Sequence, residues 1–181
     1  MEAIPRISQR RILSANRFFD LIEEHIEDRD GKPYPYYTVA SKWDAVLVVP
    51  LLPDGRVIVE RIYRHPYGAW FHEFPAGGIE PGEDPIIAGA RELREETGWI
   101  GTTMTPLTSF EALPGLLRLR LHVVLAEGLT LAGPVAHEAA EFIQVSSLSI
   151  DDAWQTARAA QSSSFLTYGL MALELRHRLE V

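Results

Sequence analysis

The sequence contains no cysteine among its 181 residues. Disulfide bonds and thiolate metal sites are therefore excluded. Long apolar runs are also missing, because no stretch approaches the roughly 20 residues that a membrane-spanning helix needs. No internal repeat or low-complexity segment is visible. These absences exclude disulfide-stapled, membrane-spanning and repeat proteins, and they indicate an ordinary globular chain.

Basic residues are scarce relative to acidic ones. The chain has 17 Lys and Arg against 25 Asp and Glu, for a formal net charge of −8. A protein that binds a nucleic-acid backbone needs a basic face, so a nucleic acid is not expected as the main partner. An acidic protein that handles a phosphate has to use metal ions to reverse the local charge. The charge balance therefore favours a small ligand over a polyanion.

The N-terminal residues 1–17 are an exception to this acidity. Their sequence has no apolar signal core. We interpret 1–17 as a short basic arm on a cytoplasmic protein, and a transit peptide is the alternative. Four arginines precede any compact run of acids: Arg6, Arg10, Arg11 and Arg17.

The segment 84–97 is predicted to be a helix. Asp84 can cap it with its carboxylate, and Pro85 occupies the first helical position, where its missing N–H costs nothing. Gly98 can end the helix in the left-handed conformation. Residues three and four apart share a helix face, so three carboxylates lie one turn apart. They are Glu92, Glu95 and Glu96.

Like charges at this spacing repel one another unless a cation lies against them. Ligand sets made only of oxygens favour hard cations such as Mg²⁺ or Mn²⁺. The helix therefore implies a divalent ion. A solvated acidic surface, with Arg91 and Arg94 as ordinary pairing partners, is the alternative for this segment taken alone.

The residues around the helix fit the pattern G-x5-E-x7-R-E-U-x-E-E-x-G-U, where U is an aliphatic residue. This pattern is the signature of the Nudix hydrolases, and the chain resembles that family. Trp99 departs from the final aliphatic position, which affects local packing and not the chemistry. The matching positions are Gly77, Glu83, Arg91, Glu92, Leu93, Glu95, Glu96 and Gly98.

The resemblance implies an α/β fold, in which a mixed β-sheet and the central helix form an α/β/α sandwich after N-terminal antiparallel strands. The segment 18–28 has apolar spacing that fits a helix better, yet Asp30-Gly31 favours a hairpin, and the resemblance decides for strands. It also divides the chain after the arm into an 18–42 β-hairpin region, used for dimerisation, and a 43–181 hydrolase domain. Strands are expected at 44–52, 56–63, 70–74, 104–111, 118–126 and 142–146, and further helices from Ser149 to about 160 and from Ser163 to about 179.

The run VIVERIYRHPYGAWFHEFPAGGIEPGE resembles ADP-ribose pyrophosphatases and related nucleotide-sugar hydrolases. Pro114, which follows Gly98 by 16 positions, is associated with the ADP-ribose subgroup, although ALPGLLRLR departs from the usual S-P-G-x-x-x-E. The implied reaction splits the pyrophosphate of a nucleoside diphosphate linked to another moiety, foremost ADP-ribose to AMP and ribose 5-phosphate. GDP-mannose, a diadenosine polyphosphate or coenzyme A are alternative substrates. A nucleotide-sensing module would need a broken signature, and this one is intact.

The resemblance also implies roles for individual residues. Glu92, Glu95 and Glu96, with the Ala76 carbonyl, hold two or more Mg²⁺ or Mn²⁺ ions. Glu83 and Arg91 orient those carboxylates.

A glutamate on a later loop, Glu138 or Glu141, supplies a metal ligand or the catalytic base, and His137 beside them is not expected to act. The loop 127–140 is expected to be mobile without substrate, because it contains Gly128, Gly133 and Pro134. The protein is expected to be a homodimer.

The expected substrate contacts lie outside the signature. Arg61 and Arg64 are expected to bind the diphosphate or a ribose, with a sheet-edge salt bridge as the alternative. Aromatic residues that could stack on a base are as typical of a core. The remaining candidates are Glu73, Pro114, Tyr37, Trp43 and Tyr67.

Overall fold

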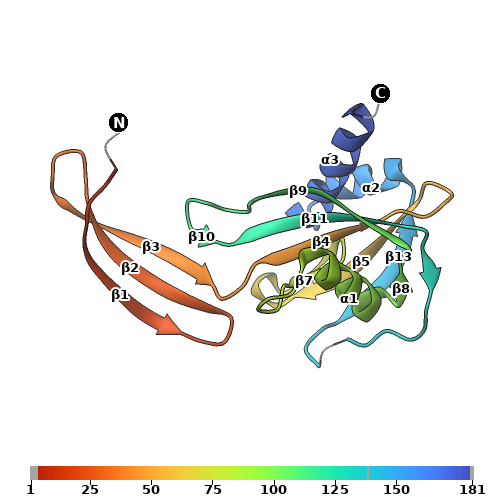
Figure 1. The fold of residues 1–181 in the computed structure, drawn as a ribbon, viewed down its shortest axis with the longest axis horizontal. Helices are drawn as coiled ribbons and strands as arrows, with labels where there is room; N and C mark the ends of the chain where they lie inside the picture. Colours follow the sequence, from red (N-terminus) through yellow and green to blue (C-terminus); the bar gives the residue numbers. More distant parts are fainter. Residues whose placement is uncertain (1–3, 138, 180–181) are drawn as a thin grey trace. The chain divides into compact units, whose positions relative to one another are not determined.

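The structure is a computed structural model, and it describes residues 4–137 and 139–179. The chain divides into two compact units. Unit 1 comprises the residues up to Asp44 together with Phe110–Arg120. Unit 2 comprises Ala45–Ser109 and the residues from Leu121 onward. Figure 1 shows the elements of both units.

Unit 1 is built on three antiparallel strands, β1 (Ile7–Ala15), β2 (Phe19–Glu27) and β3 (Pro33–Ser41). The short strand β10 (Leu117–Arg118) pairs parallel with β3. Gly31 adopts a φ of 75° in the turn between β2 and β3, a conformation that glycine accepts without strain. The strand interpretation of 18–28 is therefore confirmed, and much of the expected N-terminal arm forms a strand that pairs with it.

A mixed sheet forms the centre of unit 2. Its strands follow the order β7 (Ala76–Gly78), β4 (Ala45–Pro50), β11 (Arg120–Glu127) and β9 (Thr103–Glu111). Strand β4 pairs parallel with β11 and antiparallel with β7. Residues 46–50 of β4 are all buried, as expected for a strand covered on both faces.

A second sheet of unit 2 has the order β13 (Ile143–Leu148), β5 (Val57–Arg64) and β6 (Ala69–Glu73). A tight turn at Asp54-Gly55 leads into β5, and Gly55 has a φ of 83°. The 3₁₀ turn His65–Tyr67 joins β5 to β6. The short strands β8 (Trp99–Ile100) and β12 (Thr130–Leu131) form a separate antiparallel pair.

The three predicted helices are present as α1 (Pro85–Thr97), α2 (Ile150–Ala157) and α3 (Ser164–Leu179). Asp84 caps α1, since its Oδ1 accepts a hydrogen bond from the N–H of Ile86 at 2.8 Å. Ser149 and Ser163 accept from backbone N–H groups at the starts of α2 and α3. Each cap of this kind contributes about 1 kcal/mol. The sequence therefore located the helices, although α2 ends at Ala157 and not near residue 160.

Helices α1 and α3 cover opposite faces of strand β4. A Cβ on Gly89 of α1 would contact Val46 and Val48, whereas a Cβ on Gly169 of α3 would contact Val49. Successive side chains of a strand point to opposite faces, so β4 lies between the two helices. The expected α/β/α sandwich with a mixed sheet is thus confirmed. No helix in the described residues is long and apolar enough to cross a membrane.

Candidate active site

The three glutamates of α1 differ in burial. Glu96 is only 4% exposed, and its Oε2 accepts a hydrogen bond from the N–H of Ala76 at 2.9 Å. The Glu92 side chain is 13% exposed and that of Glu95 is 42% exposed. The helix therefore presents its acids in a gradient from the protein interior to solvent.

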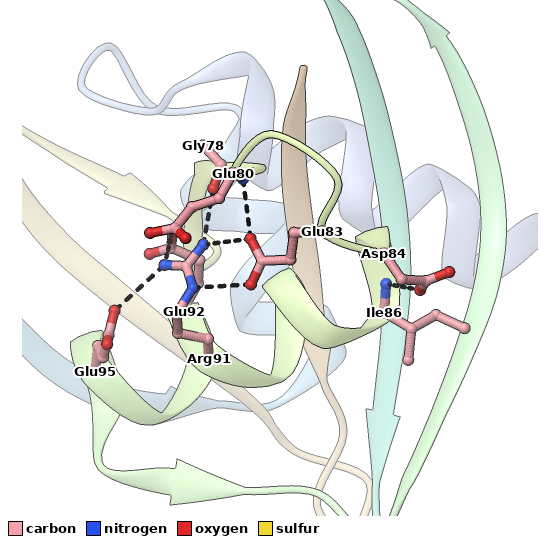
Figure 2. Close-up of polar contacts among 8 residues, drawn as sticks. All are labelled: Gly78, Glu80, Glu83, Asp84, Ile86, Arg91, Glu92 and Glu95. Carbon is pink, nitrogen blue, oxygen red and sulfur yellow. Dashed lines mark hydrogen bonds and ion pairs between the residues drawn. The ribbon is translucent and has the colours of Figure 1, made fainter. Parts of the chain in front are cut away.

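Arg91 holds these acids in place (Figure 2). Its Nε and Nη2 donate to the two oxygens of Glu83 at 3.1 and 3.0 Å, and Nη2 also donates to the Gly78 carbonyl at 2.9 Å. Its Nη1 donates to Glu92 at 2.6 Å and to Glu95 at 3.4 Å. The hydrogen bond with Glu83 is the main reason that the pKa of Arg91 lies above its ordinary value. Through these contacts Arg91 can orient the carboxylates, and the orienting roles of Arg91 and Glu83 stay a prediction.

Gly77 is required by the position of Glu92. A Cβ built on Gly77 would lie 2.1 Å from the Glu92 carboxyl carbon and 2.1 Å from its Oε1. The carboxylate therefore packs directly over the backbone of β7, where any side chain would displace it. This contact explains the first glycine of the signature in physical terms.

A further buried acid, Glu60, was missed from the sequence. It lies on β5 directly opposite Glu73 on β6, and the two residues are 1% and 3% exposed. Glu73 is paired, because Arg64 donates to its two oxygens at 2.8 and 2.6 Å. Among the described residues, the buried Oε1 of Glu60 has no hydrogen-bond partner. The sign available in the sequence was that Glu60 is the single acid in the strand VIVERI.

The buried carboxylates repel one another. Burial raises the pKa of Glu60 to about 8, and the charge of Glu73 adds to the effect. Burial also raises the pKa of Glu96 well above its usual value, and Glu60 and Glu92 reinforce the shift. The charge of Glu141 also contributes to raising the pKa values of Glu60, Glu92 and Glu96. Glu141 therefore belongs to the same electrostatic cluster, and the cluster favours an added cation.

The donor set fits a divalent metal ion. Its donors are carboxylate oxygens, which hard cations prefer, and one buried oxygen of Glu60 is without a partner. Within the described ranges, no three acidic or histidine side chains already stand in a metal-coordinating arrangement. Instead, Glu92 Oε1 accepts a hydrogen bond from Arg91, and Glu96 Oε2 accepts one from the N–H of Ala76. Metal binding would thus require the Glu92 and Glu96 carboxylates to release some of these hydrogen bonds.

Two predicted substrate contacts from β5 separate onto opposite faces of the sheet. Arg64 joins Glu73 on the face of the acid cluster. Side chains alternate along a strand, so Arg61 points to the other face. There its guanidinium lies 5.0 Å from the Trp70 ring centre and donates to Gln144 at 3.3 Å. The structure therefore brings Arg64, and not Arg61, to the candidate site.

A cavity of about 580 Å³ lies beside Arg64 and Glu73. It combines these two charged residues with apolar and hydroxyl side chains, which is typical of small-molecule sites. Tyr67 is 75% exposed and packs against Phe71 with ring centres 5.1 Å apart. The remaining lining residues are Pro66, Phe165 and Ser162, Ser163 and Ser164.

Three other predicted contacts belong to unit 1. The Tyr37 hydroxyl donates to Glu23 at 3.0 Å. Trp43 packs edge-on against Phe18, with ring centres 6.3 Å apart. Pro114 lines a cavity of about 340 Å³ within this unit. These contacts account for the residues inside unit 1, and their role in substrate binding stays a prediction.

The loop after β12 is bonded to the end of α1. Ala136 N–H donates to the Glu95 carbonyl at 2.8 Å, and the His137 Nε2 lies 2.7 Å from the Glu96 carbonyl. The sequence did not predict these two bonds, and the expected mobility of the loop without substrate stays a prediction. Glu138 lies outside the described residues, and Glu141 is half-buried.

Comparison with known proteins places this geometry in context. The sequence model described as the NUDIX domain matches residues 41–168. The ADP-ribose pyrophosphatase of Bacillus subtilis is 30% identical over 176 residues, which cover 96% of this chain and 94% of that protein. A CMP-5'-(N-acetyl-N-hydroxy-3-aminopropyl)phosphonate hydrolase of Streptomyces rubellomurinus is 27% identical and covers 90% of this chain and 79% of its own length. The crystal structure of an ADP compounds hydrolase superposes with a TM-score of 0.85 at 21% identity, covering 97% of this chain and 95% of that chain.

Proposed function

Because the chain belongs to the Nudix family, we propose that it is a metal-dependent pyrophosphohydrolase that converts ADP-ribose to AMP and ribose 5-phosphate. The observation that carries the chemistry is the cluster of buried carboxylates around α1, one of which has an unpartnered oxygen. The similarity to an ADP-ribose pyrophosphatase along 96% of the chain supports the substrate.

Glu92, Glu95 and Glu96 would hold two or more Mg²⁺ or Mn²⁺ ions, together with the Ala76 carbonyl. When bound, such ions neutralise the diphosphate and stabilise the leaving oxygen. Arg91 keeps Glu92 and Glu95 aimed in one direction through its Nη1. Bonded also to Glu83 and Gly78, the guanidinium has little freedom to turn. The protein therefore restricts the movement of its acids before the substrate arrives.

Arg64 supplies positive charge at the mouth of the cavity. Its side chain is 39% exposed, and Glu73 fixes its orientation through two hydrogen bonds. The exposed edge of the guanidinium is available to a phosphate oxygen, for which arginine is suited. One loop glutamate, Glu138 or Glu141, accepts the proton of the attacking water.

We further propose a cytoplasmic homodimer. On this proposal residues 18–42 contribute the dimer contacts, 43–181 the hydrolase domain, and 1–17 an arm that includes the whole of β1. Unit 1 supports it by exposing large apolar side chains, which often mark interfaces. They include Ile7, Ile12, Phe18, Tyr34 and Tyr37. Scattering that shows only the 20.3 kDa monomer at micromolar concentration would contradict the dimer.

The substrate is tested with a panel of nucleotide conjugates assayed with Mg²⁺ and with Mn²⁺. The panel contains ADP-ribose, GDP-mannose, a diadenosine polyphosphate, coenzyme A and a CMP-linked phosphonate, and products are identified by mass. We expect the highest kcat/KM with ADP-ribose, with AMP and ribose 5-phosphate as products. The Glu96→Gln variant is the control for contaminating hydrolases. A preference of about tenfold, or 1.4 kcal/mol, for another conjugate would overturn the substrate.

A further inference from the structure

Four successive carbonyl groups near the carboxyl end of α1, on residues 93–96, accept hydrogen bonds from the helix end or from a later loop, whereas a helix by itself leaves its last carbonyl groups unsatisfied. The Thr97 hydroxyl donates to the Leu93 carbonyl, and the N–H of Gly98 donates to the Arg94 carbonyl at 2.9 Å. These two partners come from the helix end itself. The next two come from a loop almost 40 residues farther along the chain.

The loop partners are Ala136 and His137. Ala136 N–H donates to the Glu95 carbonyl at 2.8 Å, and His137 Nε2 bonds the Glu96 carbonyl at 2.7 Å. A carbonyl oxygen can only accept, so Nε2 carries a hydrogen and donates it. That nitrogen is therefore engaged and cannot take a proton from water. The contact gives His137 a structural role at the end of α1.

The loop also packs tightly against the helix end. Ala132 N–H donates to the Gly98 carbonyl at 2.9 Å. A Cβ on Gly98 would lie 2.5 Å from the Gly133 carbonyl oxygen. Strand pairing of β12 with β8 fixes the chain just before this point. The path of residues 130–137 is thus defined by a series of backbone contacts to the end of α1.

Glu95 and Glu96 connect this loop to the acid cluster. Their carbonyl groups accept the loop bonds, while the Glu96 carboxylate accepts from Ala76 on the side of the cluster. Glu141 follows His137 by four positions, and its charge acts on Glu60, Glu92 and Glu96. His137 is the last side chain before the loop glutamates that is bonded to the helix.

We propose that His137 is a positioning residue, which fixes its loop on the carboxyl end of α1 and thereby places the loop glutamate against the carboxylate cluster. The kinetic part of this inference rests on the proposed function. The structural part does not, because the hydrogen bonds are made by the protein alone. The two parts can therefore be tested separately.

The structural test compares His137→Ala with wild type by hydrogen exchange in the metal-free protein. We expect the Ala136 amide to exchange about tenfold faster in the variant, since local opening exposes a bonded N–H. His137→Gln retains an N–H donor at similar reach, so we expect it to restore most of the protection. His177→Ala removes an exposed imidazole at the end of α3 and is the matched control. Unchanged Ala136 exchange in His137→Ala would overturn the proposal.

The kinetic test uses the same variants with ADP-ribose. A misplaced catalytic group lowers turnover more than binding, so we expect kcat to fall about tenfold in His137→Ala while KM changes little. His137→Gln should recover most of kcat, and His177→Ala should match wild type. A fall in kcat that His137→Gln fails to recover would also overturn the proposal.

A double-mutant cycle shows whether His137 acts through the loop glutamate. Glu138→Gln and Glu141→Gln are made first, and His137→Ala is added to the one with the lower kcat. Residues that act as one unit give non-additive effects. We therefore expect the added substitution to lower kcat by less than about twofold. Full multiplication of the two losses would overturn the positioning role. A wild type inactive on ADP-ribose would refute the proposed substrate and leave the exchange test in force.

Discussion

Each unit of the protein has a buried glutamate on a strand, Glu23 in unit 1 and Glu60 in unit 2. The two glutamates differ in their hydrogen-bond partners. In unit 1, Glu23 is 6% exposed and accepts hydrogen bonds from Arg11 and the Tyr37 hydroxyl. In unit 2, Glu60 is 1% exposed, and its Oε1 is without a partner among the described residues. The Arg11 hydrogen bond lowers the pKa of Glu23, whereas burial raises the pKa of Glu60 to about 8.

This difference separates a structural acid from a functional one. A buried carboxylate with partners adds to the order of its sheet. A buried carboxylate without them costs stability, and such residues are found where function requires them. The contrast therefore supports the proposed site in unit 2, and it does so without reference to any relative.

The largest effect is expected at the most buried acid of α1. Glu96→Gln replaces a carboxylate that faces the metal site by a neutral amide, so kcat should fall by at least ~10³. The melting temperature, measured in parallel, should show that the variant is folded. A folded variant that retains more than about a tenth of wild-type kcat would refute the metal-ligand assignment.

Gly77→Ala should sharpen the contrast between activity and stability. The new methyl group would displace the Glu92 carboxylate, which is the flexible end of a side chain, so little stability is lost. A misplacement of about 1 Å at an active site can cost roughly 10² in rate, and we expect a loss of that order in kcat. Thermal unfolding and steady-state kinetics of the same preparation measure both quantities. A large drop in melting temperature would show that the strand itself had moved.

Glu60→Gln should stabilise the metal-free protein. The folded-state pKa of about 8 lies above the ordinary value of 4.5, so the contribution of Glu60 to stability is fully present below 4.5 and is lost as the pH rises through 8. With EDTA present, we expect the variant to melt about 4 °C or more above wild type at pH 8, and near wild type at pH 5. Equal melting temperatures at pH 8 would mean that Glu60 has a partner in solution.

Glu23→Gln should have the smallest effect, and the opposite sign. The folded-state pKa of Glu23 lies below 4.5, so its pairing stabilises the protein above that pH and less as the pH falls through the folded value. We expect a small drop in melting temperature at neutral pH that shrinks on acidification. Assays with saturating substrate should show an unchanged kcat. The same substitution would then stabilise one unit and destabilise the other.

The sequence predicted the elements whose signals are local. Asp84, Pro85 and Gly98 fixed the ends of α1, and the signature named the acids on its face, because caps and helical spacing act within one or two turns. The segment 18–28 was harder. Its apolar spacing fits a helix, but the segment forms a strand because it pairs with β3, and a local pattern does not report that pairing.

The remaining site depended on distant pairing. Glu60 and Glu73 meet only because the turn His65–Tyr67 sets the register of β5 against β6. The same register sends Arg61 to the opposite face. His137 meets Glu96 across 41 positions of sequence. No spacing rule in a single sequence reports such contacts, so Glu60 was missed and the partners of Glu73, Arg61 and His137 were not predicted.

Neither face of strand β4 leaves room for a larger side chain, because a helix packs closely against each face. A Cβ added to Gly89 would lie 3.2 Å from Val48, and one added to Gly169 would lie 3.0 Å from Val49 and 2.4 Å from Phe74. A side chain gained at either helix glycine must therefore be matched by a loss of volume at the strand residue that it meets. Among related sequences, residues 48 and 89 should vary as one pair and residues 49 and 169 as another. Substitutions in β4 thus constrain the residues of both α1 and α3, although the two helices pack against opposite faces of the strand.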